Sequence, residues 1–191
     1  MIRVTAFNGS PRTDGNTAIL IQKVLEPLKD AGINTEVIQL GGSGIRPCSA
    51  CFSCASNKNS RCAIQDDRLN EWIEKILESN AIIIGSPTYF SSMTPETKAL
   101  IDRAGFVAKV NGDLFARKIG AGISAVRRGG AVDVMSSINK LFLISQMIIP
   151  GSTYWNFGIG MNKGEVSEDS EGIANMRNLG ENILWLLNKI C

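Results

Sequence analysis

The sequence predicts a doubly wound α/β protein, in which helices cover both faces of a parallel β-sheet. Along the whole chain, short apolar runs rich in β-branched residues alternate with segments of helical periodicity. Hydrophobic residues make up 44% and charged residues 20% of the 191 residues, which is typical of a soluble globular protein. This length suits one α/β unit with a proper core, so we expect a single domain over residues 1–191.

Five segments fit the buried strands of such a sheet, because they are short, apolar and bounded by polar or turn-forming residues. They cover residues 2–7, 35–40, 81–85, 118–125 and 148–154. No signal-peptide pattern precedes the first of them, so we expect a cytoplasmic protein.

Helical periodicity separates these strands. The i, i+3, i+4, i+7 rule is met by two sets of apolar residues, Ile21, Val24, Leu25 and Leu28, and Leu69, Trp72, Ile73 and Ile76. Further helices are expected over residues 95–107, 132–147 and 173–190, the last with its core face formed by Met176, Leu179, Ile183 and Leu187. Pro27 interrupts the first pattern, so we expect a kink or an early helix end there.

Composition excludes several classes of function. The chain has no histidine, which removes Ser-His-Asp nucleophiles, His-ligated zinc and His acid/base catalysis and favours chemistry supplied by a cofactor. The net charge is +2 without a run of Lys and Arg, so no nucleic-acid partner is expected. The longest apolar stretch, residues 141–150, is far below the ~20 residues of a membrane span.

The first strand leads into a Gly-containing loop, residues 9–17, which is followed at once by a helical pattern. This arrangement presents backbone N–H groups and the positive end of a helix dipole to an anion. Gly15 permits the turn, and further bonds to phosphate can come from Ser10, Arg12, Asn16 and Thr17. The spacing fits neither a Walker A loop nor Gly-x-Gly-x-x-Gly, so a monophosphate is expected. A turn before a capped helix, without a ligand, is the alternative.

Two further loops should flank this site, because ligands of open α/β sheets bind beyond the carboxyl ends of the strands. Residues 86–93 combine a proline, two aromatic rings and several hydroxyls, a mixture that suits a flat ring system. Residues 126–130 end in Gly129 and Gly130, which allow a close backbone approach. The three loops together outline a flavin mononucleotide, although ordinary strand-to-helix connections remain the alternative, above all for the Gly-Gly loop.

Four motifs resemble, in order, those of flavodoxin-like NADPH-dependent FMN reductases, over almost the whole chain. They are Gly9-Ser10-Pro11-Arg12, Gly15-Asn16-Thr17, Gly85-Ser86-Pro87-Thr88-Tyr89-Phe90 and Lys98-Ala99-Leu100-Ile101-Asp102-Arg103. The resemblance implies a three-layer flavodoxin-like fold with strand order 2-1-3-4-5 and a homodimer or homotetramer. It implies FMN phosphate at Ser10, Arg12, Asn16 and Thr17. It places the isoalloxazine ring beside Pro87, Thr88, Tyr89, Phe90 and Ser91, with further contacts near Arg128, Gly129 and Gly130.

Residues 41–66 show neither the helical nor the strand periodicity and form an unusually long loop, which must be held in place. The loop contains Cys48, Cys51, Cys54 and Cys62 with the spacing C-x2-C-x2-C-x7-C. Without a secretion signal, such a group predicts a metal or redox site rather than a disulfide framework. Three neighbouring thiolates and a fourth further on can hold an iron-sulfur cubane. The fifth cysteine, Cys191, is expected to be incidental.

This spacing also resembles the compact cysteine motif of the iron-sulfur flavoproteins, a branch of the same family found largely in anaerobes. The resemblance implies a 4Fe-4S cluster bound by the four cysteines. Two alternatives stay open. The thiols can be free or reversibly oxidised without a cluster, or they can bind zinc, although structural zinc more often uses two separated C-x2-C pairs.

We therefore expect an FMN-dependent oxidoreductase that moves electrons between ferredoxin or NAD(P)H and a small acceptor such as a quinone, a flavin or an oxygen species. FMN carries the chemistry, so no catalytic side chain is expected. Two other hypotheses stay open. One is an FMN-only NAD(P)H-dependent flavin or quinone reductase with cluster-free cysteines, and the other is a non-catalytic redox sensor.

Overall fold

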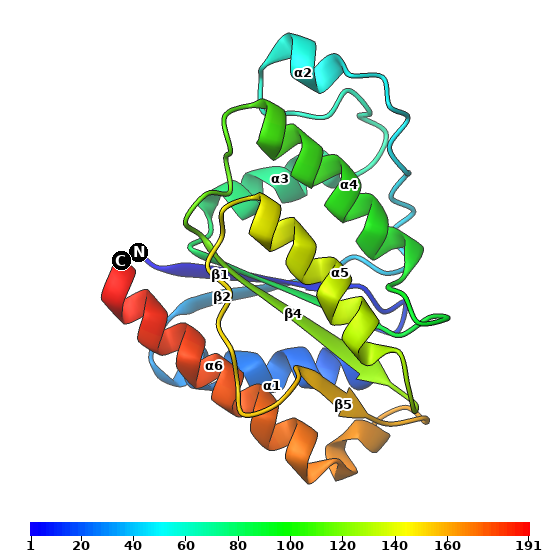
Figure 1. Cartoon of the computed structure of the whole chain (residues 1–191), viewed down its shortest axis with the longest axis vertical. Helices are drawn as coiled ribbons and strands as arrows, with labels where there is room; N and C mark the ends of the chain where they lie inside the picture. Colours follow the sequence, from blue (N-terminus) through cyan, green and yellow to red (C-terminus); the bar gives the residue numbers. More distant parts are fainter.

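The computed structural model describes residues 1–191 and confirms the doubly wound fold (Figure 1). One parallel sheet has the order β2-β1-β3-β4-β5, as the resemblance implied. Its strands are β1 (Arg3–Asn8), β2 (Asn34–Gln39), β3 (Ala81–Pro87), β4 (Ile119–Val126) and β5 (Phe157–Ile159).

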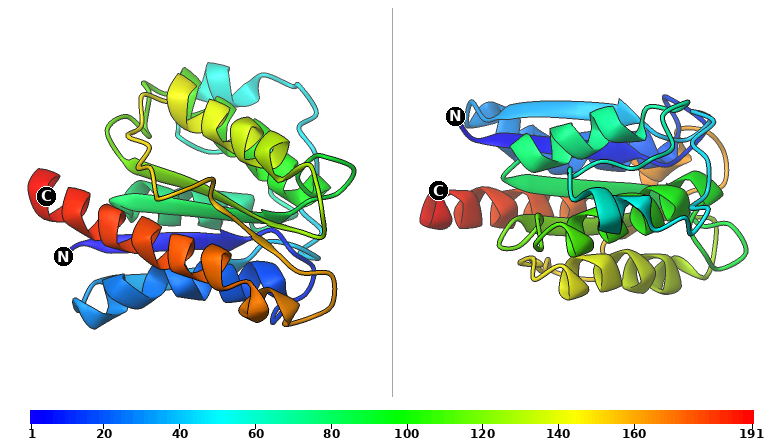
Figure 2. Two further views of the ribbon diagram at one scale, coloured as in Figure 1. Left: turned by 60° about the horizontal axis from the view of Figure 1, so that its bottom comes forward. Right: turned by 90° about the horizontal axis from the view of Figure 1, so that it is seen from above.

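The sheet lies between two helical layers, which Figure 2 shows from two further sides. On one face, α1 (Asn16–Asp30) and α6 (Ser170–Ile190) enclose a buried apolar cluster that includes Leu20 and Met176. On the other face, α3 (Leu69–Glu78), α4 (Pro95–Val110) and α5 (Ala131–Ile144) enclose a second cluster that includes Trp72, Leu100 and Ile138. Two short elements, α2 (Ser53–Asn57) and the 3-10 helix η1 (Glu165–Glu168), lie outside these layers. None of the helices combines the length and the apolar composition that a membrane-spanning helix needs.

Most of the expected elements are confirmed, with the first four strands within two residues of their expected ends. The early helix end at Pro27 is wrong, because α1 continues to Asp30. Pro27 is buried where α6 approaches closely, since a Cβ on Gly180 would lie 2.6 Å from the Pro27 Cγ. Packing against α6 therefore stabilises the helix across the proline.

The expected fifth strand, residues 148–154, is also wrong, because β5 lies at Phe157–Ile159. Only Ile148 pairs with the sheet in the earlier segment, through a bridge to Ile119. Pro150 has no N–H to continue the pairing, so the chain leaves the sheet there. It returns at Asn156, whose carbonyl accepts a hydrogen bond from the Ser124 N–H at 3.0 Å.

Candidate functional site

A hollow of about 180 Å³ opens beyond the carboxyl ends of β1, β3 and β4. The structure brings together seven of the residues expected to bind FMN, namely Ser10, Arg12, Asn16, Thr17, Pro87, Thr88 and Tyr89. The other six do not line it: Gly15, Phe90, Ser91, Arg128, Gly129 and Gly130. Six further residues line it: Pro11 of the loop over residues 9–17, Val126 and Arg127 of the expected flanking loop, and Ala125, Gly160 and Met161, which were not expected at the site. The hollow is smaller than the roughly 300 Å³ of a complete small-ligand pocket, so it fits the phosphate and sugar end of a mononucleotide.

Side chains from two neighbouring strands fix the loop at the end of β1. The Asn8 Oδ1 accepts a hydrogen bond from the Ser10 N–H at 3.1 Å, and its Nδ2 donates to the Arg12 carbonyl at 3.3 Å. Gln39 at the end of β2 donates from Nε2 to the carbonyls of Ser10, at 2.6 Å, and Gly41, at 2.8 Å. The shape of the loop is therefore held by hydrogen bonds from the protein's own side chains.

The first turn of α1 is suited to an anion. Its N-cap, Gly15, supplies no side-chain acceptor, and the first helical bond runs from the Ile19 N–H to the Gly15 carbonyl. The N–H groups of residues 16–18 thus lack helical partners, and no acidic residue lies in this turn. Thr17 is 1% exposed and lines the hollow, where its hydroxyl makes no hydrogen bond to another residue. These groups fit an FMN phosphate.

Asn16 connects the expected phosphate loop, residues 9–17, to a distant part of the chain. Its Nδ2 donates to the carbonyls of Gly160, at 3.1 Å, and Asn162, at 2.9 Å. Its Oδ1 accepts from the Gly164 N–H at 2.8 Å. Because these bonds occupy the side chain, Asn16 holds the wall of the hollow that Gly160 and Met161 form, and its bond to phosphate stays a prediction.

The loop after β3 forms a tight turn at the rim of the hollow. Tyr89 and Ser92 exchange backbone hydrogen bonds of 2.8 and 2.9 Å around Phe90 and Ser91. Both corner residues have positive φ, 48° and 59°, and the Phe90 side chain is fully exposed. Gly130, at a φ of 89°, packs on this turn, since a Cβ there would lie 2.8 Å from the Ser91 Cα. These residues form an outer rim beside the hollow.

A second cavity, of about 280 Å³, is lined by all four cysteines of the loop, Cys48, Cys51, Cys54 and Cys62. Most of its other lining residues, such as Phe106 and Val107 of α4, are apolar. No two cysteines form a disulfide. Within the chain, no three Cys, Asp or Glu side chains are grouped so that they could hold a single metal ion. The thiols surround a space rather than meeting at one point, and four sulfur donors around an apolar cavity suit an iron-sulfur cluster.

The thiols of this cavity differ in their environments. The pKa of the exposed Cys51 is lowered, chiefly by a hydrogen bond from the Ser53 side chain. Burial, followed by repulsion from Cys62, raises the pKa of Cys54. A bound metal favours the thiolate form of both, because the thiolate is the ligand.

The backbone around the cysteines is unusual, because four non-glycine residues in residues 48–62 have positive φ. They are Ala50, Phe52, Lys58 and Ser60, with φ between 50° and 59°. Left-handed conformations cost non-glycine residues roughly 1–2 kcal/mol each. This segment therefore depends on contacts with the rest of the molecule.

A buried ion pair supplies such a contact. The Arg103 side chain on α4 is fully buried and pairs with Asp67, whose side chain is 5% exposed, at an N–O distance of 2.5 Å. Burial alone raises the pKa of Asp67, but hydrogen bonds from Arg103 and two backbone N–H groups outweigh it, and the pKa is lowered. Burial likewise opposes the charge of Arg103, yet bonds to Asp67 and Cys62 raise its pKa. Arg103 belongs to the motif Lys98–Arg103, in which the sequence alone indicated no role for it.

Helix α4 connects the two sites. At its N-cap, the Thr94 Oγ1 donates to the Gly9 carbonyl of the phosphate loop at 2.9 Å. Arg103 lies nine residues further along, which is a rise of about 14 Å in an α-helix. The hollow beside the phosphate loop and the cavity lined by the four cysteines are thus supported by different turns of one helix.

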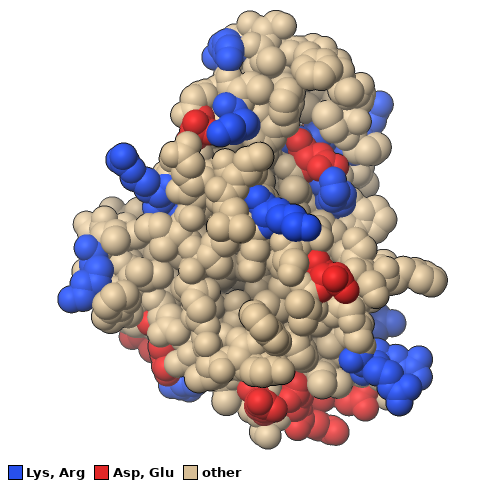
Figure 3. Space-filling model, in the orientation of Figure 1, with Lys and Arg blue, Asp and Glu red and all other residues tan.

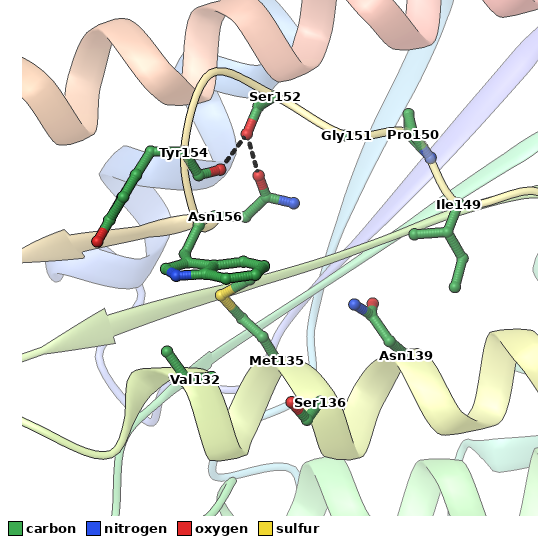
Figure 4. Close-up of a pocket in the computed structure, with 11 residues that line it drawn as sticks. Val132, Met135, Ser136, Asn139, Ile149, Pro150, Gly151, Ser152, Tyr154 and Asn156 are labelled. Atoms are coloured by element: carbon green, nitrogen blue, oxygen red, sulfur yellow. Dashed lines mark hydrogen bonds between the residues drawn. The ribbon is translucent and has the colours of Figure 1, made fainter.

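The largest cavity, of about 480 Å³, lies between α5 and the excursion over residues 149–156 (Figure 4). Met135 and Asn139 point from α5 toward this excursion. The Ser152 hydroxyl lies within hydrogen-bond distance of both the Tyr154 carbonyl and the Asn156 Oδ1, which fixes the turn on the other side. None of the residues expected to bind a cofactor lines this cavity.

Known proteins resemble the chain in sequence and in fold. An iron-sulfur flavoprotein of Methanocaldococcus jannaschii is 33% identical, over 99% of this chain and 99% of its own length. One from Methanosarcina thermophila is 30% identical, over 99% and 97%. The structure of RosB with the bound intermediate 8-demethyl-8-formylriboflavin-5'-phosphate covers 100% of this chain and 80% of its own, with a TM-score of 0.76 and 17% identity. A flavodoxin from the domain Archaea covers 98% and 99%, with a TM-score of 0.63 and 15% identity.

The structural likenesses confirm the flavodoxin-like fold, and the sequence matches identify the family. The family described as NADPH-dependent FMN reductase matches residues 2–162, which include the phosphate loop, the cysteine loop and both loops beyond β3 and β4. The chain therefore belongs to the NADPH-dependent FMN reductase family and is an FMN-dependent oxidoreductase.

Proposed function

We propose that this protein transfers electrons between ferredoxin or NAD(P)H and a small acceptor, through FMN and a 4Fe-4S cluster. The observation that carries the proposal is that Cys48, Cys51, Cys54 and Cys62 line one cavity. When bound, FMN exchanges electrons in pairs or singly and the cluster exchanges one at a time. The names of the two sequence relatives, both iron-sulfur flavoproteins, support the cluster.

The protein's own groups orient the mononucleotide in this proposal. The first-turn amides of α1 and the hydroxyls of Ser10 and Thr17 bind the phosphate, and the exposed Arg12 adds its charge. Thr88 and Tyr89 line the hollow and would contact the flat ring of the flavin. The Tyr89–Ser92 turn at the rim would border the ring system.

Replacing Thr17 with Val tests the phosphate site, because it removes the free hydroxyl and keeps the side-chain shape. We expect FMN to bind about tenfold more weakly, since the lost bond to a charged group is worth about 1.4 kcal/mol or more. Fluorescence titration of FMN-free protein measures this. Thr13→Val, in the same loop but exposed and outside the hollow, is the matched control. Equal affinities of the two variants would place the phosphate elsewhere.

Anaerobic purification tests the cluster. Iron and acid-labile sulfide should be found at the ratio of one 4Fe-4S cluster per chain, and Cys54→Ser should lose most of both, because Cys54 is the buried ligand of the cavity. Cys191→Ser, far along the chain and outside the cavity, should keep them. FMN bands with less than one iron per chain in the unmodified protein would remove the cluster. Metal analysis of the same sample reports any zinc.

The electron donor is identified by mixing the anaerobic protein with NADPH, NADH or reduced ferredoxin and following the flavin absorbance. Reduction by ferredoxin alone supports an electron-transfer role. Steady-state turnover of an acceptor with NAD(P)H that stays intact in Cys54→Ser supports the FMN-only reductase instead.

We also propose that residues 1–191 act as one domain that assembles into a homodimer or homotetramer. Residues 149–156 carry no charged side chain, and the surface over them is tan in Figure 3, although α5 beside them carries Asp133 and Lys140. Several large apolar side chains are exposed there, at 66% for Leu143, 58% for Tyr154 and 55% for Trp155. Monomers rarely expose large apolar patches, and light scattering gives the mass in solution.

A further inference from the structure

Arg103 is the one charged residue whose side chain is completely buried, and it lies against the cysteine cavity. It occupies a core-facing position of α4, between Leu100 and Ala104 in the buried stripe. A guanidinium at such a position is costly unless every N–H group has a partner. The hydrogen-bond partners of the Arg103 guanidinium therefore indicate the role of this buried charge.

The guanidinium donates to both ends of the cysteine loop. Nη1 donates to the Arg46 carbonyl, at 3.0 Å, just before Cys48. Nη2 donates to the Ile64 carbonyl, at 3.4 Å, just after Cys62. Asp67 accepts from both Nη1 and Nη2, and its carboxylate also accepts from the Arg46 N–H at 3.1 Å. Arg103 thus holds the two flanks of the loop against α4.

Two of its N–H groups are directed at a sulfur. Nε and Nη2 donate to the Cys62 Sγ at 3.4 and 3.3 Å, which is normal for hydrogen bonds to sulfur. Among the four cysteines of the cavity, Cys62 alone accepts from a charged side chain. Because Asp67 balances the charge of the guanidinium, the local effect on Cys62 comes mainly from these two directed N–H groups.

We propose that Arg103 is a positioning residue that fixes the Cys62 thiolate and raises the reduction potential of the cluster bound there, an inference that rests on the proposed function. Reduction adds negative charge that spreads onto the ligand sulfurs. N–H groups that point at a sulfur stabilise the reduced form more than the oxidised form, so the potential rises.

The test is an EPR-monitored redox titration of the cluster in the anaerobic protein. In Arg103→Gln we expect electron affinity to fall at least tenfold, which is a shift of 59 mV to lower potential for one electron. Arg103→Lys keeps the charge but loses the paired donors. Its cluster should therefore have a reduction potential between those of the unmodified protein and Arg103→Gln. Arg61→Gln is the matched control, since Arg61 precedes Cys62 but is exposed and paired with Glu74. In Arg61→Gln the electron affinity of the cluster should change less than twofold.

The outcomes separate this inference from the proposal beneath it. If the unmodified protein binds no cluster, both are overturned. If it binds one and both Arg103 variants show the unmodified potential, or Arg61→Gln shifts equally, only the role of Arg103 is overturned. If both Arg103 variants lose iron, hydrogen–deuterium exchange decides. Faster exchange confined to residues 46–67 supports positioning, whereas faster exchange through β1 and α6 as well means that Arg103 merely stabilises the fold.

Discussion

Replacing Gly41 with Ala should weaken FMN binding by about 100-fold, which corresponds to about 2.7 kcal/mol. A Cβ at this position would lie 2.2 Å from the Ser10 carbonyl carbon and 2.5 Å from the Pro11 nitrogen. These are backbone atoms of the phosphate loop, so they cannot turn aside as a flexible side chain does. Either the loop or the end of β2 must move, and the donors that face the phosphate move with it.

Isothermal titration of FMN into cofactor-free protein measures this loss. Gly151→Ala is the matched control, because nothing lies within 4 Å of a Cβ there and its backbone is not left-handed. It should bind FMN like the unmodified protein. If Gly41→Ala does so as well, the phosphate loop does not need the close approach of the two backbones.

Replacing Asp67 with Asn should lower the free energy of unfolding by about 3–5 kcal/mol, because it leaves the buried Arg103 without its counter-charge. Asp66→Asn is the matched control. Asp66 is the next residue but is 59% exposed and paired with the exposed Arg46, so its loss should cost no more than about 1 kcal/mol. Urea unfolding of the three proteins, in the same cofactor state, gives both values.

The difference between Asp67→Asn and the unmodified protein should depend on pH in a defined direction. The pKa of Asp67 is lower in the folded state than the ~3.9 of an unfolded chain. Its stabilisation is therefore fully present above about pH 4 and is lost as the pH falls through the folded value. The difference between the two proteins should be constant from neutral pH to about pH 5 and shrink in more acidic solution. A constant difference down to pH 3 would mean that Asp67 acts through its shape alone.

The sequence predicted the sheet well because its signal is local. Strands β3 and β4 are mostly apolar and almost fully buried, and β1 is buried from Val4 to Asn8. Strand β2 lies at the edge of the sheet and is only partly buried. The fifth was misplaced because Ile148 and Ile149 are apolar and β-branched, whereas the real strand Phe157–Ile159 has only three residues, with glycine at its centre. Only the pairing with β4, which is not local, selects the shorter segment.

In the candidate site too, features that are local in the sequence could be predicted, and features that depend on the fold could not. The phosphate loop is contiguous, so its residue types and spacing could be recognised. Gly160 and Met161 reach the hollow through Asn16 from far along the chain, and no local pattern indicates them. Arg103 did leave a signal, since it interrupts the apolar stripe of its helix and must have a buried partner. The identity of that partner, Asp67, depends on the fold.

The four left-handed residues among the cysteines have a consequence for how the protein is made. A segment with this backbone is a poor candidate to fold by itself, whereas the sheet has apolar clusters on both faces that need no metal. We therefore expect the sheet and its helices to form without help from the cysteine loop. If the proposed cluster is bound, we expect it to be inserted late, into a fold that is otherwise complete, and to be replaced without unfolding of the sheet.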